Sequence, residues 1–85
     1  MAYRTRVDGN EYKFVRSGLF GTGTYVKIYL NGRLIDEMEF EDMGGDPSLL
    51  TESGYFETMC RFWAGTDNTN RRVEKSIKEI YTTGN

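Results

Sequence analysis

Histidine is absent from this chain of 85 residues, and cysteine and proline each occur only once. Histidine is the commonest general base and the commonest metal ligand, so its absence argues against most hydrolase mechanisms and zinc sites. The single cysteine, Cys60, cannot form an intramolecular disulfide. Because the sequence also shows no secretion signal and no N-x-[ST] sequon, we expect a reducing, cytoplasmic location.

Long apolar runs are missing as well. No stretch approaches the roughly 18 residues that a membrane span requires, which argues against a transmembrane helix. Hydrophobic residues make up 38% of the chain, and six tyrosines, five phenylalanines and one tryptophan supply large rings that can be buried. This composition predicts a single globular domain over residues 1–85 with one modest core.

Two turn signals divide the first half of the chain. Asp8-Gly9 and Asn31-Gly32 are favoured pairs for a type I′ turn, because both central positions of that turn need a positive φ. They predict two β-hairpins, at about 3–16 and 24–41. A glycine-rich connector separates the hairpins.

The first hairpin separates apolar from charged side chains. Its implied register puts one set on one face: Tyr3, Thr5, Val7, Tyr12 and Phe14. The other face carries Arg4, Arg6, Glu11 and Lys13. This separation is typical of an antiparallel pair with one buried face.

The second hairpin is apolar on both faces. Its implied register pairs Ile28 with Ile35 and Lys27 with Asp36. One face then carries Val26, Ile28, Leu30 and Ile35, and the other carries Tyr25, Tyr29, Leu34 and Met38. Such a strand pair is either enclosed within the fold or covered by a partner.

Helical signals fill the second half of the chain. Asp46-Pro47 is typical of an N-cap followed by proline at the first helical position, and one or two short helices are predicted over about 47–64. Ser53-Gly54 predicts a break within that range, and Ala64-Gly65 predicts its end. The polar residues 66–70 predict a connector, and a C-terminal helix is predicted at about 71–82.

The helical region has its own apolar stripe. Phe56, Met59, Cys60 and Trp63 follow i, i+3, i+4, i+7 spacing and share one side of a helix. Two hairpins followed by helices predict an α+β domain, in which helices cover one face of a small antiparallel sheet.

Charge is segregated along the chain, although the net charge is only −2. Residues 1–33 carry six basic and two acidic residues, residues 34–60 carry eight acidic and no basic residues, and residues 61–85 carry five basic and three acidic residues. The acidic residues from Asp36 to Asp46 lack EF-hand spacing, so no metal site is predicted. They form either a solvated strand face or a contact surface for a basic partner.

Neither the cysteine nor the glycines indicate catalysis. Cys60 lies on the apolar stripe, and the chain has no histidine to activate it as a nucleophile. Gly18, Gly21 and Gly23 match neither a dinucleotide fingerprint nor a P-loop. We therefore expect no catalytic residue and no cofactor, and the protein is predicted not to be an enzyme.

The sequence instead predicts a non-catalytic protein-binding module, such as the small inhibitors and adaptors that phages and mobile elements encode. An acidic strip would steer the module onto a basic protein surface, and apolar side chains would anchor it. The predicted partner-binding residues are Glu37, Glu39, Glu41, Asp42, Leu19, Phe20 and Trp63. A homodimer formed through the sheet is a variant of this hypothesis.

Two alternatives stay open. One is a small-ligand or nucleotide binder whose pocket forms at an oligomer interface. The other is nucleic-acid binding through the basic face of the first hairpin, at Arg4, Arg6 and Lys13 with Arg16 nearby. It is disfavoured because the rings of that hairpin lie on the face opposite the charges, whereas a stacking platform needs both on one surface.

Overall fold

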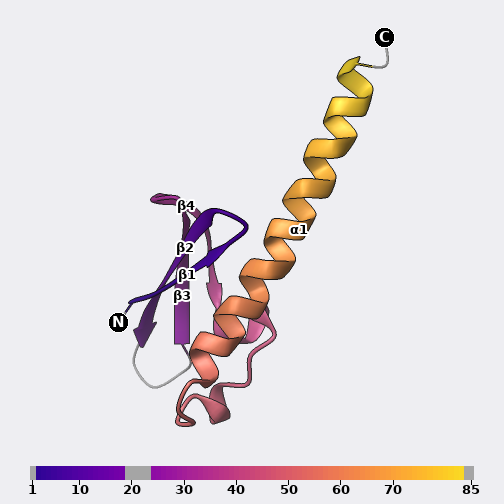
Figure 1. The fold of residues 1–85 in the computed structure, drawn as a ribbon. Helices are drawn as coiled ribbons and strands as arrows, with labels where there is room; N and C mark the ends of the chain where they lie inside the picture. Colours follow the sequence, from indigo (N-terminus) through magenta and orange to yellow (C-terminus); the bar gives the residue numbers. More distant parts are fainter. Residues whose placement is uncertain (1, 19–23, 84–85) are drawn as a thin grey trace.

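The computed structural model describes the backbone of residues 2–18 and 24–83, with side chains for 2–17 and 24–69. Four strands form one antiparallel sheet in chain order: β1 (Ala2–Val7), β2 (Asn10–Gly18), β3 (Thr24–Leu30) and β4 (Arg33–Glu39). Two short 3-10 helices, η1 (Phe40–Met43) and η2 (Pro47–Leu49), lead to a long helix, α1 (Tyr55–Thr83). This helix crosses one face of the sheet (Figure 1). The predicted α+β class is confirmed.

Both predicted turns are present. Asp8 and Asn31 each have a φ of +49°, and the glycines that follow them have φ of +83° and +86°. These are the positive values that a type I′ turn requires. The first hairpin keeps the predicted register throughout, from Tyr3 opposite Phe14 to Val7 opposite Asn10.

The second hairpin departs from the predicted register at a bulge. Ile28 lies opposite Asp36 and Lys27 opposite Glu37, so the predicted pairs Ile28–Ile35 and Lys27–Asp36 are wrong. The shift sets Met38 opposite Val26, which is fully buried. An unshifted register would set the carboxylate of Glu37 there. The bulge thus sets Met38 rather than Glu37 opposite Val26, while Asp36, opposite buried Ile28, remains exposed.

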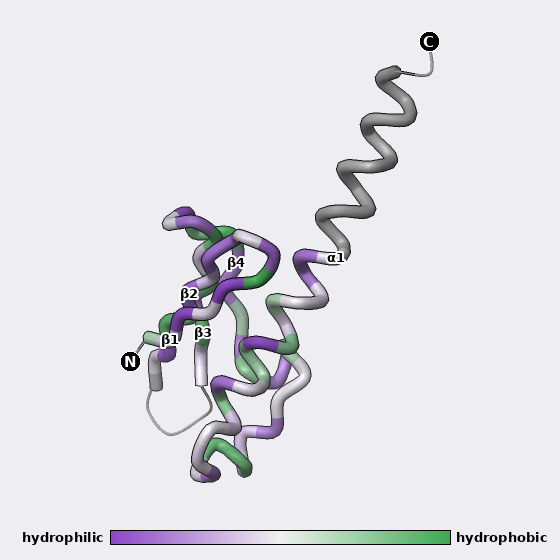
Figure 2. The backbone as a smooth tube through the Cα atoms, in the orientation of Figure 1, coloured by the Kyte–Doolittle hydropathy of each residue, from purple (hydrophilic) through white to green (hydrophobic). Residues whose placement is uncertain are grey.

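The core lies between the sheet and α1. Hydrophobic and hydrophilic residues are interspersed along the strands (Figure 2), and four inward-facing residues on β2 and β3 have no exposed area. These are Tyr12, Phe14, Val26 and Ile28. The predicted helical stripe meets them, because Phe56 and Cys60 are buried and Met59 and Trp63 pack against the same cluster.

Helix η1 closes one end of this core. Phe40 is fully buried, and its ring centroid lies 5.7 Å from that of Phe56 and 5.9 Å from that of Tyr55. Beyond η1, the predicted cap at Asp46 is confirmed, since its Oδ1 accepts a hydrogen bond from the Ser48 amide at 3.0 Å. The helix that it caps is only the short η2. The predicted break before Tyr55 is also present, with Gly54 at a φ of +81°.

The predicted stop at Ala64-Gly65 and the predicted connector at 66–70 are wrong, because α1 continues unbroken through both. The polar residues there bind the tip of the first hairpin. The Asn68 side chain is 3% exposed. Its Oδ1 accepts a hydrogen bond from Nδ2 of Asn10 (2.8 Å), and its Nδ2 donates one to Oδ2 of Asp8 (2.9 Å). The predicted helix at 71–82 is therefore the continuation of α1. Among the described residues, no helix has the length and apolar character needed to cross a membrane.

Candidate protein-binding surface

One face of the sheet is not covered by α1 (Figure 1). Side chains alternate between the two faces of a strand, so the neighbours of the buried core residues lie on this second face. We call it the open face. On the three strands β2, β3 and β4 its members include Lys13, Val15, Tyr25, Lys27, Tyr29, Leu34, Glu37 and Glu39. The predicted basic residues Arg4 and Arg6 of β1 lie on the same face, because Arg4 is opposite Lys13 and Arg6 is opposite Glu11.

The open face carries two tyrosines on β3, with the exposed Lys27 between them. Tyr25 and Tyr29 are half-buried, and Leu34, opposite Tyr29 on β4, is 49% exposed. The Nζ atom of Lys13 lies 4.5 Å from the centroid of the Tyr29 ring, in a cation–π contact. Tyr29 and Leu34 therefore form a small apolar area of the kind that binding surfaces bury, with Tyr25 further along the strand.

Four of the predicted acidic residues lie on β4 and the turn that follows it. The bulge directs Glu37 and Glu39 to the open face, opposite Lys27 and Tyr25. Glu41 and Asp42 follow in η1, and all four side chains are exposed. These four residues form an acidic strip, of which Glu37 and Glu39 lie beside Lys27 and Tyr25 on the open face.

Tyr25 lies beside this strip. The pKa of its hydroxyl is raised above the ordinary value of 10.0 by burial, by the negative charge of Glu37 and by a hydrogen bond to that carboxylate. Like an unperturbed tyrosine, it is protonated at neutral pH and can donate a hydrogen bond.

The predicted aromatic anchor Trp63 lies away from this strip. Its ring packs edge-on against Tyr12 and Phe14, with centroid distances of 6.4 and 6.0 Å, on the helix-covered side of the sheet. Its neighbour Phe62 is 70% exposed. The predicted loop anchors Leu19 and Phe20 lie outside the described residues.

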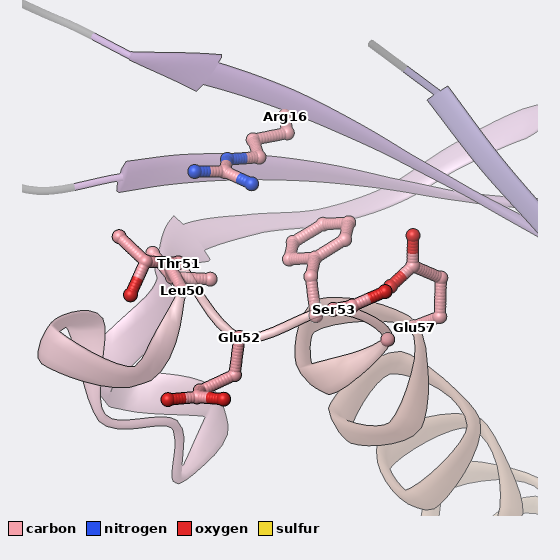
Figure 3. A pocket seen from close by; sticks show the side chains of 8 residues that line it. Arg16, Leu50, Thr51, Glu52, Ser53 and Glu57 are labelled. Carbon is pink, nitrogen blue, oxygen red and sulfur yellow. The ribbon is translucent and has the colours of Figure 1, made fainter.

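A small cavity opens at the start of α1. Its volume is about 240 Å³, and Figure 3 shows Arg16 reaching from the sheet over the loop that carries Leu50 to Ser53. The Arg16 guanidinium lies 5.4 Å from the centroid of the Phe56 ring, and Glu52 and Glu57 line the cavity. The space is below the range of about 300–1,000 Å³ that is usual for small-molecule sites.

The single cysteine, Cys60, is buried in the core. Burial and the nearby Glu57 raise the pKa of the Cys60 thiol to about 12, against the smaller opposing effect of Arg61, so the thiol is protonated at neutral pH. No group of three or more potential metal-binding side chains is found among the residues that the structure describes.

The sequence already contained a signal for the open face. Along residues 25–30, apolar and aromatic side chains lie on both faces of the predicted strand, which indicates that both faces are covered. That signal implicated Tyr25, Tyr29 and Leu34, but it placed Met38 with them, whereas the bulge puts Met38 on the core-facing side. Comparison of the chain with protein-family models, curated proteins and solved structures gives no match. The functional argument therefore depends on this surface alone.

Proposed function

We propose that this protein is a non-catalytic protein-binding module of the inhibitor or adaptor type, which binds a basic protein surface through the open face of its sheet. The observation that carries the proposal is the set of Tyr25, Tyr29 and Leu34 on the uncovered face, beside the exposed carboxylates of Glu37 and Glu39. A few residues, enriched in Trp, Tyr and Arg, supply most of the binding energy at protein interfaces, and charges at the rim influence the association rate and the choice of partner.

The roles of the two groups differ. Tyr25 and Tyr29 lose little conformational entropy on binding, because both are already half-buried and each side chain has only two rotatable angles. Glu37 and Glu39 are exposed, so their attraction to a basic partner is screened by salt. Removing the rings should therefore speed dissociation, and reversing the charges should slow association.

The test is capture of the partner from a lysate of the source cell, followed by affinity measurements with purified partner. Tyr25→Ala and Tyr29→Ala are each expected to weaken binding by about tenfold or more. The double variant Glu37→Lys/Glu39→Lys is expected to lower the association rate and flatten its dependence on salt.

A matched control is Glu52→Lys/Glu57→Lys, which makes the same change in net charge at the cavity. It should leave the affinity unchanged. Equal losses in the two charge variants would contradict the proposal, as would full affinity in both tyrosine variants.

Nucleic-acid binding is the second candidate, because β3 places rings and cations on one surface. Lys27 lies between Tyr25 and Tyr29 along the strand, and Lys13 covers the Tyr29 ring. Stacking rings beside cations suit single-stranded nucleic acid. Glu37→Lys/Glu39→Lys distinguishes the two functions, since it should strengthen binding of a labelled oligonucleotide and weaken binding of a basic protein.

A further inference from the structure

The two edges of the sheet differ in how they are protected. An edge strand presents backbone N–H and C=O groups that can pair with another chain, and proteins blunt such edges with bulges and charges. The edge strand β4 has both devices. A bulge interrupts its pairing with β3, and the Glu37 amide donates a hydrogen bond to Oδ1 of the neighbouring Asp36 at 2.9 Å.

The opposite edge, β1, has neither device. All six of its residues pair with β2 in one unbroken register, and β2 is its only neighbour among the strands of the described residues. Exposure alternates along β1. The exposed residues are Ala2, Arg4 and Arg6, and the half-buried residues are Tyr3, Thr5 and Val7.

The turn at Asp8-Gly9 determines which backbone groups of β1 face outward. The pair that flanks a two-residue turn is hydrogen-bonded, and bonded pairs then alternate with non-bonded pairs along an antiparallel ladder. Val7, Thr5 and Tyr3 therefore bond to β2, whereas the N–H and C=O groups of Arg6 and Arg4 are directed away from it. An added strand would bond to these two arginines.

The side chains of the same two arginines make the edge basic. Arg4 lies opposite Lys13, so two cations face each other across the strand pair. Arg6 lies opposite Glu11, but its ion pair is long, at 3.6 Å, and its side chain remains 69% exposed. Like charges directly opposite are destabilising, so a carboxylate on the outer side of Arg4 would offset a repulsion that is already present.

A third cation lies on the helix side of this edge. Arg61 of α1 is exposed, and its Nη1 donates a hydrogen bond to the Tyr3 hydroxyl at 2.9 Å. The β1 edge therefore has positive charge on both sides of the sheet, which favours an acidic partner.

We propose that the β1 edge binds an extended acidic segment of a partner protein, which adds to the sheet as a further antiparallel strand. Its acidic residues would lie directly opposite Arg4 and Arg6, and would exchange backbone hydrogen bonds with them. The residues between them would lie on the other side of the sheet, next to Tyr3 and Thr5. Apolar side chains fit there, because Tyr3 packs against the core and is only half-buried.

A second copy of this chain is a poorer occupant. Its β4 carries Glu37 and Glu39 at the required spacing, but the bulge and the bond from the Glu37 amide to Asp36 obstruct pairing at that edge. The acidic segment is therefore assigned to another protein.

This site goes beyond the proposed function. It lies at the opposite edge of the sheet from the acidic strip, with β2 and β3 between them, and it selects the opposite charge. One molecule can thus hold an acidic strand and a basic surface together, as an adaptor does.

Peptide binding tests the proposal. The probe is a fluorescein-labelled peptide of six residues, the length of β1, in which glutamate and valine alternate. Fluorescence anisotropy with the full chain is expected to give a dissociation constant below about 1 mM. A peptide with lysine in place of glutamate should bind at least tenfold more weakly.

Methylation of the peptide backbone separates strand addition from attraction between charges. N-methyl groups on the glutamates remove the donors that face β1 and should weaken binding at least tenfold. N-methyl groups on the valines are the matched control, since those amides point away from β1, and they should have little effect. Equal losses in the two peptides would overturn the proposal, as would no binding at about 1 mM.

A pair of protein variants tests the position of the site. Arg4→Glu is expected to weaken binding of the glutamate peptide at least tenfold. Arg33→Glu makes the same change in charge at an exposed arginine of β4 and should bind as the wild type does. Trp63 fluorescence should show that both variants are folded. Equal losses in the two variants would contradict a site at β1.

Sedimentation of the wild type without peptide tests the choice of occupant. The chain is expected not to associate through β1. Oligomers that Arg4→Glu dissociates would assign the edge to a second copy and overturn the proposal. None of these results depends on Tyr25, Tyr29 or Glu39, so the test of the open face stands apart from them.

Discussion

Cys60 and Gly65 lie five residues apart on α1, and each residue's role depends on the space around it. Cys60 is fully enclosed between the helix and the sheet. A Cβ atom added at Gly65 would meet nothing within 4 Å. Burial therefore restricts which side chain fits at Cys60. Gly65 makes no side-chain contact and affects stability only through the conformational freedom of its backbone.

The burial of Cys60 predicts a pH-dependent contribution to stability. In the unfolded chain the thiol ionises near its ordinary pKa of 9.0, but in the folded protein it holds its proton up to a pKa of about 12. The contribution is therefore fully present below pH 9 and is lost as the pH rises from 9 to 12. Urea unfolding at a series of pH values should show the wild type losing stability relative to Cys60→Ala in this window. Parallel curves for the two proteins would contradict the assignment.

Gly65→Ala is predicted to stabilise the protein by about 0.5–1 kcal/mol. Glycine in the middle of a helix costs conformational entropy, and the new methyl group has room. The measurement is the free energy of unfolding in urea. Gly32→Ala is the control, and it should destabilise the protein, because Gly32 has a φ of +86° that alanine rarely adopts.

The neighbouring rings Phe62 and Trp63 show what helical periodicity predicts at this scale. Adjacent helical residues point about 100° apart, so the two rings differ in burial. The stripe of Phe56, Met59, Cys60 and Trp63 indicated that Trp63 faces the core, and its ring packs on Tyr12 and Phe14. The same stripe did not indicate Trp63 as a partner-binding residue, although Trp63 was also among the predicted partner-binding residues.

Among the elements, the first hairpin was fully predictable and the second was not. The register of a hairpin is determined when it has a two-residue turn and a single apolar face. The sequence shows both features between Tyr3 and Phe14, and the structure has the register that they predict. The second hairpin has apolar residues on both faces, so the pattern did not indicate the bulge. Its position depends on which side chain meets buried Val26.

The helix was misjudged for a related reason. Residues 66–70 have the composition of a connector, yet Asp67 and Asn68 bind Tyr12, Asn10 and Asp8 across the molecule. Tertiary hydrogen bonds compensate for the low helix propensity of these residues. No local pattern reveals such partners, because they lie 55 to 60 residues away in the sequence.

This explanation predicts the effect of removing one of these groups. Asn68→Ala should cost about 1–3 kcal/mol of the free energy of unfolding, because Asn10 loses a buried hydrogen-bond partner. Thr69→Ala, at the adjacent exposed position, should cost much less. Unfolding in urea measures both variants. Equal effects would mean that the polar residues of α1 do not hold the hairpin tip.

At the scale of the whole molecule, the fold separates a core from two uncovered sides. One side of the sheet and one side of α1 form the core, the other side of the sheet forms the open face, and Phe62 is exposed on α1. Within the acidic strip, Glu37 and Glu39 lie on the open face.

The central claim is that the open face, and not the cavity beside Arg16, binds the macromolecular partner. Hydroxyl-radical footprinting of the free protein and of its complex with the captured partner tests this claim directly, because it reports the solvent exposure of individual side chains. We predict that Tyr25, Tyr29 and Leu34 become protected in the complex while Leu50 and Arg16, which line the cavity, do not change. Protection confined to Leu50 and Arg16, with unchanged oxidation of both tyrosines, would contradict the account.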